Sequence, residues 1–447
     1  MNSLELRAAF SLAFIYVLRM LGLFMIMPVM AVAAQQYPDY SMLLVGLAIG
    51  GYGLTQSCLQ IPMGVLSDKI GRKPVIIIGL LMFSLGSFVA AYADTLLWVV
   101  VGRFLQGAGA IAGAIMALAG DLSRENQRPK VMAIIGVAIG FSFYLALLLG
   151  PSIANKFGLN GIFLATGTLA FVCIALTVWG VPNAEKTAPS ADTLPILNDL
   201  KALFVHPQLA RLNISVMLLH MLITLLFVKI PTFFVNLGWG IGSHWQLYLL
   251  ILTISVVGLA LVMTLGKKWQ QSQLVQFAIL GLCAVFAGLA FDKSSMIILL
   301  LWSCGFFICF NYLEANFPAM VSSIAPAGKK GSAMGIYASF QFFGAFLGGV
   351  ISGTVSHLLN SQWLFVSAAL VCLLWAFFIK GLVGTRRLKR YTLSLTDAPE
   401  DEVLQQLQSL TGLKDLSYVA SECVLYINAN AQIFDLQQAR KILNLQE

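Results

Sequence analysis

The chain has 447 residues, of which 59% are hydrophobic and only 10% are charged. A soluble protein carries about 25% charged and about 45 to 50% apolar residues, so a larger core alone does not account for this composition. The composition therefore predicts a protein that crosses a lipid bilayer several times. Because the polar surface is small, the net charge of +8 does not indicate a nucleic-acid partner.

The cysteine and histidine patterns give no sign of a metal site, a cofactor or an enzyme. The sequence has no C-x-x-C pair, no G-x-S-x-G element and no glycine-rich phosphate loop, and its four histidines are dispersed. Most of the seven cysteines fall in apolar runs, where a thiol behaves as a small hydrophobic group. We therefore expect free thiols and no metal.

Apolar runs of about 20 residues, the length that crosses a hydrocarbon core of about 30 Å, recur between polar breaks. The longest hydrophilic gap follows Pro182 and divides these runs six and six. This predicts two six-helix bundles, residues 1–182 and 208–385, joined by a cytoplasmic linker at 183–207. The twelve predicted spans are 8–34, 41–66, 74–94, 96–121, 129–156, 158–180, 208–237, 244–265, 273–291, 294–322, 329–358 and 362–382.

Basic residues in the short loops predict the orientation of the chain. Eighteen Lys and Arg residues lie on the side that holds both termini, against two, Lys156 and Lys293, on the other side. Because loops rich in Lys and Arg stay in the cytoplasm, both termini are expected to be cytoplasmic. A faint internal repeat, in which Gly150-Pro151 matches Gly348-Gly349 at an offset of 198 residues, is typical of secondary transporters.

Residues 388–447 have a soluble composition and predict a small cytoplasmic domain. The alternating segment 390–395 predicts a strand, and the apolar positions between Val403 and Leu410 predict a helix. A hairpin around Ser421-Glu422 and a second helix are expected to follow. This βαββα order indicates a C-terminal α+β ferredoxin-like domain without its last strand, a candidate binding module for a small ligand.

The loop after the second span reads GVLSDKIGRKP from Gly64 to Pro74. It resembles the signature loop of the major facilitator superfamily at every defining position. In that family the arginine of the loop pairs with an acid at the end of the fourth span. The resemblance implies a latch that holds the cytoplasmic gate closed in the outward-facing state, made of Gly64, Asp68, Gly71, Arg72, Lys73 and Asp121. The alternative is that these charges only enforce the topology.

Two further motifs resemble this family. Arg103 and Gln106 belong to a segment similar to R-x-x-Q-G-x-G-A, whose arginine is associated in the family with proton coupling. Gly150-Pro151 resembles the antiporter motif, in which glycine and proline shape helix packing. The usual trailing Gly-Gly is replaced by Ala154-Asn155, so symport stays open beside antiport.

The chain as a whole is similar to drug:proton antiporters of this superfamily. The resemblance implies an all-α membrane fold of twelve helices that works by alternating access in the bacterial inner membrane. The expected function is proton-coupled efflux of small organic compounds by a monomer, with protons and the lipid bilayer as its other partners. Two alternatives remain, a symporter or facilitator of a metabolite and a membrane sensor that acts through its C-terminal domain.

Ionisable residues inside the bilayer are candidates for function, because a charge at a helix centre costs roughly 2.5 to 3.5 kcal/mol on insertion scales. Arg19 and Glu314 are both expected near the midplane. A carboxylate that faces a cavity there could bind and release a proton. The alternative is a static ion pair between Arg19 and Glu314 that links the two halves.

Three other polar residues complete the predicted site. Asn311 and Glu314 lie three residues apart and are expected on one helix face. In the seventh span, His220 and Lys229 project about 180° apart, so only one can face a cavity. We choose His220, for which a packed structural histidine is the alternative, and expect Lys229 to snorkel toward the surface. Phe306, Phe307 and Phe310 are expected to be lipid-facing or packing residues, with an apolar substrate pocket as the alternative.

Overall fold

The computed structural model describes residues 1–124, 127–182, 197–326, 329–384, 388–395, 398–419, 423–430 and 433–443. In this part of the chain, eleven helical segments are long and apolar enough to cross a membrane. One of them, Lys130–Gly180, has 51 residues, which at about 1.5 Å per residue is more than twice the thickness of a bilayer core. It is broken at Gly158, whose φ is 67°, so it makes two crossings and the twelve predicted spans are accounted for.

Helices of the first half begin and end within a few residues of the predicted spans. They are α1 (Ser3–Phe24), α2 (Met30–Ala33), α3 (Met42–Ile70), α4 (Arg72–Ala91), α5 (Leu96–Ala108), α6 (Ala112–Asp121) and α7 (Arg128–Ala175), which a π-helical turn, Leu176–Gly180, continues. Those of the second half are α9 (Pro207–Asn236), α10 (His244–Leu265), α11 (Gln271–Phe291), α12 (Met296–Ile324), α13 (Lys330–Leu358) and α14 (Ser361–Phe378). Between the two halves, α8 (Leu197–Val205) lies within the predicted linker, for which no helix was predicted.

Two spans predicted as continuous helices are interrupted. The fourth is divided into α5 and α6 at Gly109, whose ψ of 51° is not helical. Close packing on α4 requires glycine there, because an added Cβ would lie 2.2 Å from the carbonyl oxygen of Gly79. The first leaves helical geometry between Phe24 and Met30, where Pro28 has no backbone N–H to donate. Glycine and proline at these positions fit the breaks, but a hydropathy count does not detect them.

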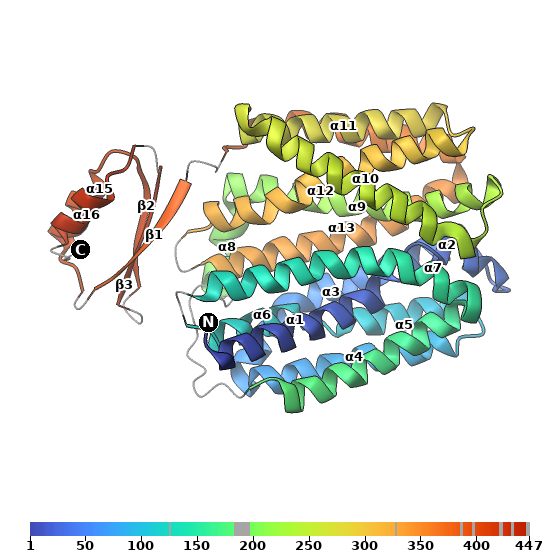
Figure 1. Ribbon diagram of the computed structural model, residues 1–447, viewed down its shortest axis with the longest axis horizontal. Coiled ribbons are helices and arrows are strands. Elements are labelled where there is room, and N and C mark those ends of the chain that lie inside the picture. The colour runs from blue at the N-terminus through green and yellow to red at the C-terminus, as the bar shows by residue number, and fades with distance from the viewer. Residues whose placement is uncertain are drawn as a thin grey trace.

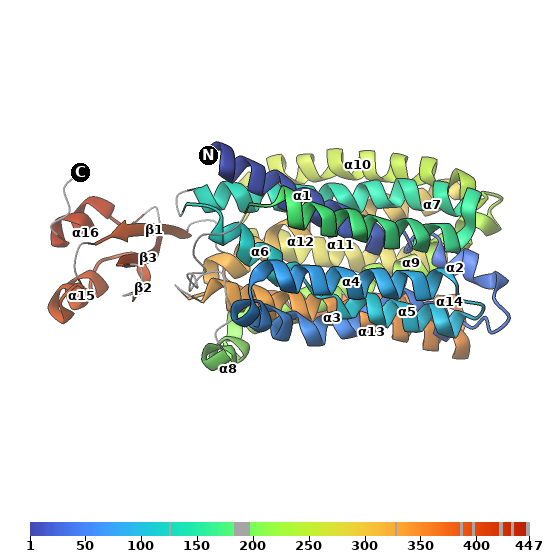
Figure 2. The same ribbon diagram turned by 90° about the horizontal axis from the view of Figure 1, so that it is seen from below.

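The spans lie side by side along the long axis of the molecule (Figures 1 and 2). The N-terminus, α8 and the C-terminal domain lie at one end, which we call the terminal face. We call the opposite end, which carries α2 and the fold-back of α7, the distal face.

Equivalent contacts in the two halves match the predicted repeat. A Cβ added at Gly150 of α7 would lie 2.3 Å from the carbonyl oxygen of Met25, after α1. A Cβ added at Gly348 of α13 would lie 2.2 Å from the carbonyl oxygen of Met221 in α9. The fifth span thus packs on the first as the eleventh packs on the seventh, with glycine at the equivalent position in each pair.

The end of the last span of each half is held by an arginine from the first span of the same half. Arg7 donates hydrogen bonds to the carbonyl oxygens of Gly180 and Trp179, at 2.9 Å each. Arg211 donates to the carbonyl oxygen of Gly381 at 3.2 Å. Since carbonyl groups at a helix C-terminus lack partners and carry partial negative charge, both arginines stabilise these ends.

The two halves meet backbone to backbone between α3 and α13. Cβ atoms added at Gly46, Gly50 and Gly53 would lie 2.0, 2.6 and 2.3 Å from carbonyl oxygens of α13. Nearer the terminal face the helices are further apart, since a Cβ added at Gly335 would meet no atom closer than an Ile61 side-chain carbon at 3.9 Å. Along this pair of helices, the structure is therefore closed at the distal face.

The C-terminal domain contains β1 (Leu388–Ser394), α15 (Asp401–Gln408), β2 (Leu413–Val419), β3 (Val424–Asn430) and α16 (Leu436–Ile442), in the predicted order. Its sheet has the strand order β1-β3-β2, and β3 is antiparallel to both neighbours. Leu393, Leu407 and Leu425 belong to its own hydrophobic core. The predicted turn at Ser421-Glu422 lies outside the described residues.

We expect Gly50→Leu to open the distal face. Its side chain would have to displace the backbone of α13, so the two helices would separate there. Spin labels would be placed on cysteines introduced at Gln36 and Asn236, one on each half. In double electron–electron resonance, the distance between them should increase and its distribution should broaden.

Gly335→Leu is the matched control, because a Cβ atom there meets no atom closer than 3.9 Å. It should leave the label distance unchanged. An unchanged distance in Gly50→Leu as well would mean that these glycines do not close the distal face.

Candidate functional site

Three polar side chains from three spans of the second half meet at a similar depth. Glu314 comes from α12, His220 from α9 and Gln341 from α13. Gln341 Nε2 lies 2.8 Å from His220 Nε2 and donates to Glu314 Oε1 at 3.1 Å. His220 Nε2 and Glu314 Oε2 are 3.9 Å apart. We call these residues the central cluster.

The hydrogen bonds of the central cluster fit one tautomer of His220. His220 Nδ1 lies 3.2 Å from the carbonyl oxygen of Val216, which can only accept, so Nδ1 carries a proton. The Gln341 amide group donates to both other residues, so His220 Nε2 and Glu314 Oε1 both act as acceptors. The structure therefore fits a neutral His220 whose proton is on Nδ1. Protonation of His220 Nε2 would require the Gln341 amide to turn its oxygen toward the imidazole.

Glu314 remains accessible although it lies ten residues before the end of α12, about 15 Å into the bundle. Its side chain is 34% exposed and its Oε2 has no hydrogen-bond partner among the described residues. The His220 side chain is 17% exposed. Part of each side chain can therefore be reached by a proton or a ligand, although Glu314 Oε2 itself is buried.

Aromatic residues surround the central cluster. The Phe310 ring lies 5.9 Å from the imidazole of His220, and Phe143 of the first half packs on Phe227, Phe307 and Phe310. These rings connect the two halves. Since Phe306, Phe307 and Phe310 are at most 5% exposed, they act as packing residues in this conformation.

Asn311 lies one turn from Glu314 and marks the boundary between the halves. Its side chain lies beside the Tyr144 hydroxyl of α7, and its Nδ2 has no hydrogen-bond partner in the described structure.

Arg19 does not join the central cluster. Its Nη2 donates to Gln56 Oε1 and to the carbonyl oxygen of Gly109, at 2.9 Å each. The guanidinium also lies 5.9 Å from the ring centre of Phe83. All these partners belong to the first half, so the predicted alternative of an Arg19–Glu314 ion pair is wrong.

Arg103 and Gln106 are also enclosed within the first half. The three nitrogens of the Arg103 side chain donate to Gln106 Oε1 and to the carbonyl oxygens of Ala48 and Ile49, and its guanidinium lies 4.6 Å from the ring centre of Tyr52. Gln106 Nε2 donates to Ser87. With neither side chain exposed, their position supports a role in joining α5 to α3 and α4.

The predicted latch residues meet at the terminal face. Arg72 bonds to the carboxylate of Asp68, and its Nε donates to Asp121 Oδ2 at 3.1 Å. The side chains of Arg72 and Asp121 are 3% and 2% exposed, and that of Asp68 is 29% exposed. Gly71 has φ 98°, a conformation that suits glycine and brings α4 back toward α3.

The remaining latch residues also form contacts within the first half. The Gly64 carbonyl accepts from Ser67, whose hydroxyl also accepts from Arg72, and Lys73 donates to the carbonyl oxygen of Val181. The latch was expected in the outward-facing state, but here it is formed while the distal face is closed. Its presence alone therefore does not distinguish an outward-facing from an inward-facing state.

Two polar residues of the second half were missed or misplaced by the sequence reasoning. Gln341 was not predicted, since a lone glutamine in an apolar span carries no charge signal. Lys229 does not snorkel, because it is 5% exposed on a segment of α9 that is enclosed on all sides.

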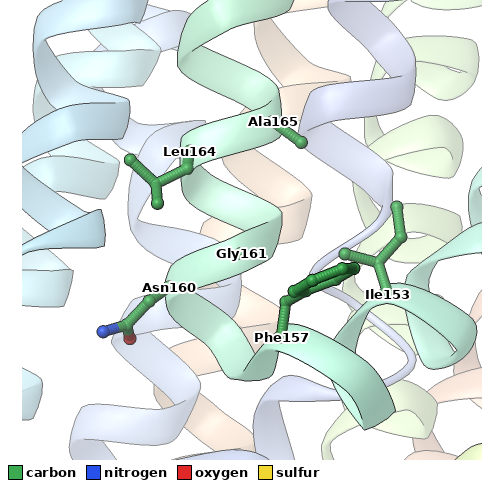
Figure 3. Close-up of a pocket in the computed structure, with 6 residues that line it drawn as sticks. All are labelled: Ile153, Phe157, Asn160, Gly161, Leu164 and Ala165. Atoms are coloured by element: carbon green, nitrogen blue, oxygen red, sulfur yellow. The ribbon is translucent and has the colours of Figure 1, made fainter.

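A cavity of about 460 Å³ lies near the fold-back of α7 (Figure 3). Its lining is formed by Ile153, Phe157, Asn160, Gly161, Leu164 and Ala165. It holds no ionisable side chain and no member of the central cluster, so we assign it no part in coupling. Among the described residues, no group of His, Cys, Asp and Glu is arranged to hold a metal ion.

Comparisons with known proteins agree with this arrangement. The chain is 35% identical over 448 residues to the inner membrane transport protein YajR of Escherichia coli (strain K12), covering 97% of each protein. It is 35% identical over 352 residues to an uncharacterized transporter of Buchnera aphidicola, covering 78% of this chain and 90% of that protein. The crystal structure of a D-xylose–proton symporter shares the fold, with a TM-score of 0.67, 16% identity, and coverage of 86% of this chain and 99% of that one.

The match to a family covers most of the chain. Residues 12–315 and 277–429 match the Major Facilitator Superfamily. This match and the relative that is 35% identical agree with the two six-helix halves and the signature loop around Arg72. This chain is therefore a membrane transporter that belongs to the major facilitator superfamily.

Proposed function

We propose that this transporter exports small organic compounds in exchange for protons across the bacterial inner membrane. The observation that carries the proposal is Glu314, a carboxyl group deep in the bundle whose side chain is 34% exposed. The relatives support the direction and the membrane. YajR is described as an inner membrane transport protein, and a multidrug resistance protein, MdtL of Klebsiella pneumoniae, is 26% identical over 195 residues, or 43% of this chain.

Coupling in this scheme depends on which species occupies Glu314. Its carboxylate accepts one hydrogen bond from Gln341 and leaves Oε2 free. A proton on Oε2 would neutralise a charge that is costly in the bilayer, and a substrate that donates a hydrogen bond would compete for the same oxygen atoms. Competition for one site is sufficient for exchange, because the transporter then changes between its inward-facing and outward-facing states with either a proton or a substrate bound at Glu314.

The face from which Glu314 can be reached determines the side of the membrane with which this conformation exchanges a proton. Because α3 and α13 are closed at the distal face, Glu314 communicates with the terminal face. The excess of Lys and Arg at that face supports a cytoplasmic location for it and for both termini. The structure then corresponds to an inward-facing state, in which an exporter releases a proton and takes up its substrate.

The latch of Gly64, Asp68, Gly71, Arg72, Lys73 and Asp121 is proposed to stabilise the terminal end of the first half, where α13 of the second half must dock to close the cytoplasmic gate. Arg103, Gln106, Gly150 and Pro151 are proposed to keep that half rigid during the movement.

We propose that the C-terminal domain is a ferredoxin-like module that binds a small ligand. The strand order β1-β3-β2, with α15 connecting the two outer strands, is that of a split βαβ unit. Deletion of residues 388–447 should leave transport intact if this domain only regulates it.

We expect Glu314→Gln to abolish proton-driven transport while substrate binding survives. Glutamine has nearly the same shape and keeps an acceptor for Gln341, but it cannot exchange a proton. Uptake into inside-out vesicles under an imposed pH gradient should fall to the level of protein-free liposomes, and substrate exchange without a gradient should persist.

Glu400→Gln makes the same chemical change outside the bundle and should leave both activities unchanged. Full gradient-driven transport by Glu314→Gln would exclude Glu314 as the proton site. If Glu314→Gln loses transport only when the imposed pH gradient is reversed, this result would favour the alternative of symport.

We expect Asp68→Asn to increase the inward-facing fraction with little change in stability, because Asp68 is partly exposed. Asp121→Asn should increase it too, and should also lower the melting temperature, because Asp121 is the fully buried one of the two carboxylates that pair with Arg72. Single-molecule fluorescence transfer between dyes on cysteines at Ile70 and Ser323 would report the terminal-face distance. Identical distance distributions in wild type and both variants would contradict a role of the latch in closing the gate.

A further inference from the structure

Arg19 is a buried cation whose charge is not neutralised by any residue in contact with it. It is 1% exposed, and within the described part of the chain no carboxylate lies within 4 Å of its guanidinium. Its Nη2 has two acceptors, but Nε and Nη1 are buried without a hydrogen-bond partner. Burying an unpaired charge is costly, so these donors need an acceptor.

The interrupted fourth span places a second set of free donors beside Arg19. Helix α6 begins at Ala112, and its N-cap residue Ile111 provides no side-chain hydrogen bond. The first N–H groups of a helix have no partners within it and carry partial positive charge. Arg19 is fixed at this break, because its Nη2 donates to the carbonyl oxygen of Gly109, three residues before α6.

Two glutamines of α3 enclose the same space. Gln56 accepts from Arg19, and its Nε2 lies 3.4 Å from Gln60 Oε1. A Cβ added at Gly113, in the first turn of α6, would lie 3.7 Å from Gln60 Nε2. Gln56 and Gln60 are 0% and 5% exposed. Arg19, the two glutamines and the start of α6 therefore form one buried polar site.

We propose that this site binds a small anion, either an inorganic halide or the carboxylate of an organic compound. Arg19 supplies the positive charge and two free donors, and the N-terminus of α6 supplies backbone donors on the other side. Broken helices whose N-termini point at anionic groups are a recurring construction of transporter sites. The site lies wholly in the first half and does not depend on proton exchange at Glu314.

The test is the thermal unfolding of the purified full-length protein in lipid nanodiscs, without substrate or gradient. Isethionate, which is neither a halide nor a carboxylate, would be replaced at constant ionic strength by chloride or by acetate as the carboxylate probe. For wild type we expect the melting temperature to rise saturably by about 2 to 4 °C in at least one of these anions, at concentrations well above its dissociation constant. A rise in chloride alone indicates an inorganic ion, and a rise in acetate indicates a carboxylate site.

Two variants assign the effect to Arg19. Arg19→Met should lose the dependence on the anion, and Arg19→Lys should retain part of it. Arg103→Met is the matched control, because Arg103 is equally buried but all its nitrogens already have acceptors. It should lower stability and keep the anion dependence.

Bromide provides a measurement that needs no variant. Crystals of wild type grown in bromide should show an anomalous scattering peak in hydrogen-bonding distance of Arg19 Nε or Nη1 if the site takes a halide. Equal melting temperatures of wild type in chloride, acetate and isethionate, with only water at Arg19 in the bromide crystals, would overturn the proposal.

Discussion

The structure depends on one constraint of the bilayer, which is that every buried polar group must find its partner within the protein. Where a span is interrupted or ends, its backbone carbonyl groups lose their helical partners, and basic side chains replace them. Arg19 bonds the carbonyl exposed at the break in the fourth span, and Arg7 and Arg211 bond the carbonyls at the ends of the sixth and twelfth. These three arginines thus bind backbone carbonyl groups of the protein itself.

The same constraint explains the contrast between the halves. In the first half, the buried cations are occupied by structural partners: Arg103 by carbonyl oxygens and Arg72 by two aspartates. In the second half, Glu314 and His220 share the single donor group of Gln341. One half is therefore electrostatically satisfied in this conformation, apart from Arg19, and the other retains groups that can change partners.

Much of the fold could be predicted because hydropathy measures the quantity that the bilayer selects, the length of an apolar run. The latch partners were predictable as well, since Arg72 lies one turn from Asp68 and the family motif names the acid. The separation of Arg19 from Glu314 was not, because depth along a span says nothing about the direction in which a side chain points. Gln341 was invisible for a related reason: its role arises only from the two spans that pack against α13, and nothing in its own segment distinguishes it.

The arginine ties between the first and last spans have a mechanical consequence. Arg7 joins α1 to the end of the sixth span, and Arg211 joins α9 to the end of the twelfth, so each set of six helices is a ring closed on itself. A closed ring resists shear among its members, and rotation is then easiest between rings, about the glycine seam of α3 and α13. Each ring also contains what it needs to hold its shape. A chain severed between residues 182 and 197 should thus yield two fragments that insert separately and reassemble, with the covalent connection contributing proximity rather than fold.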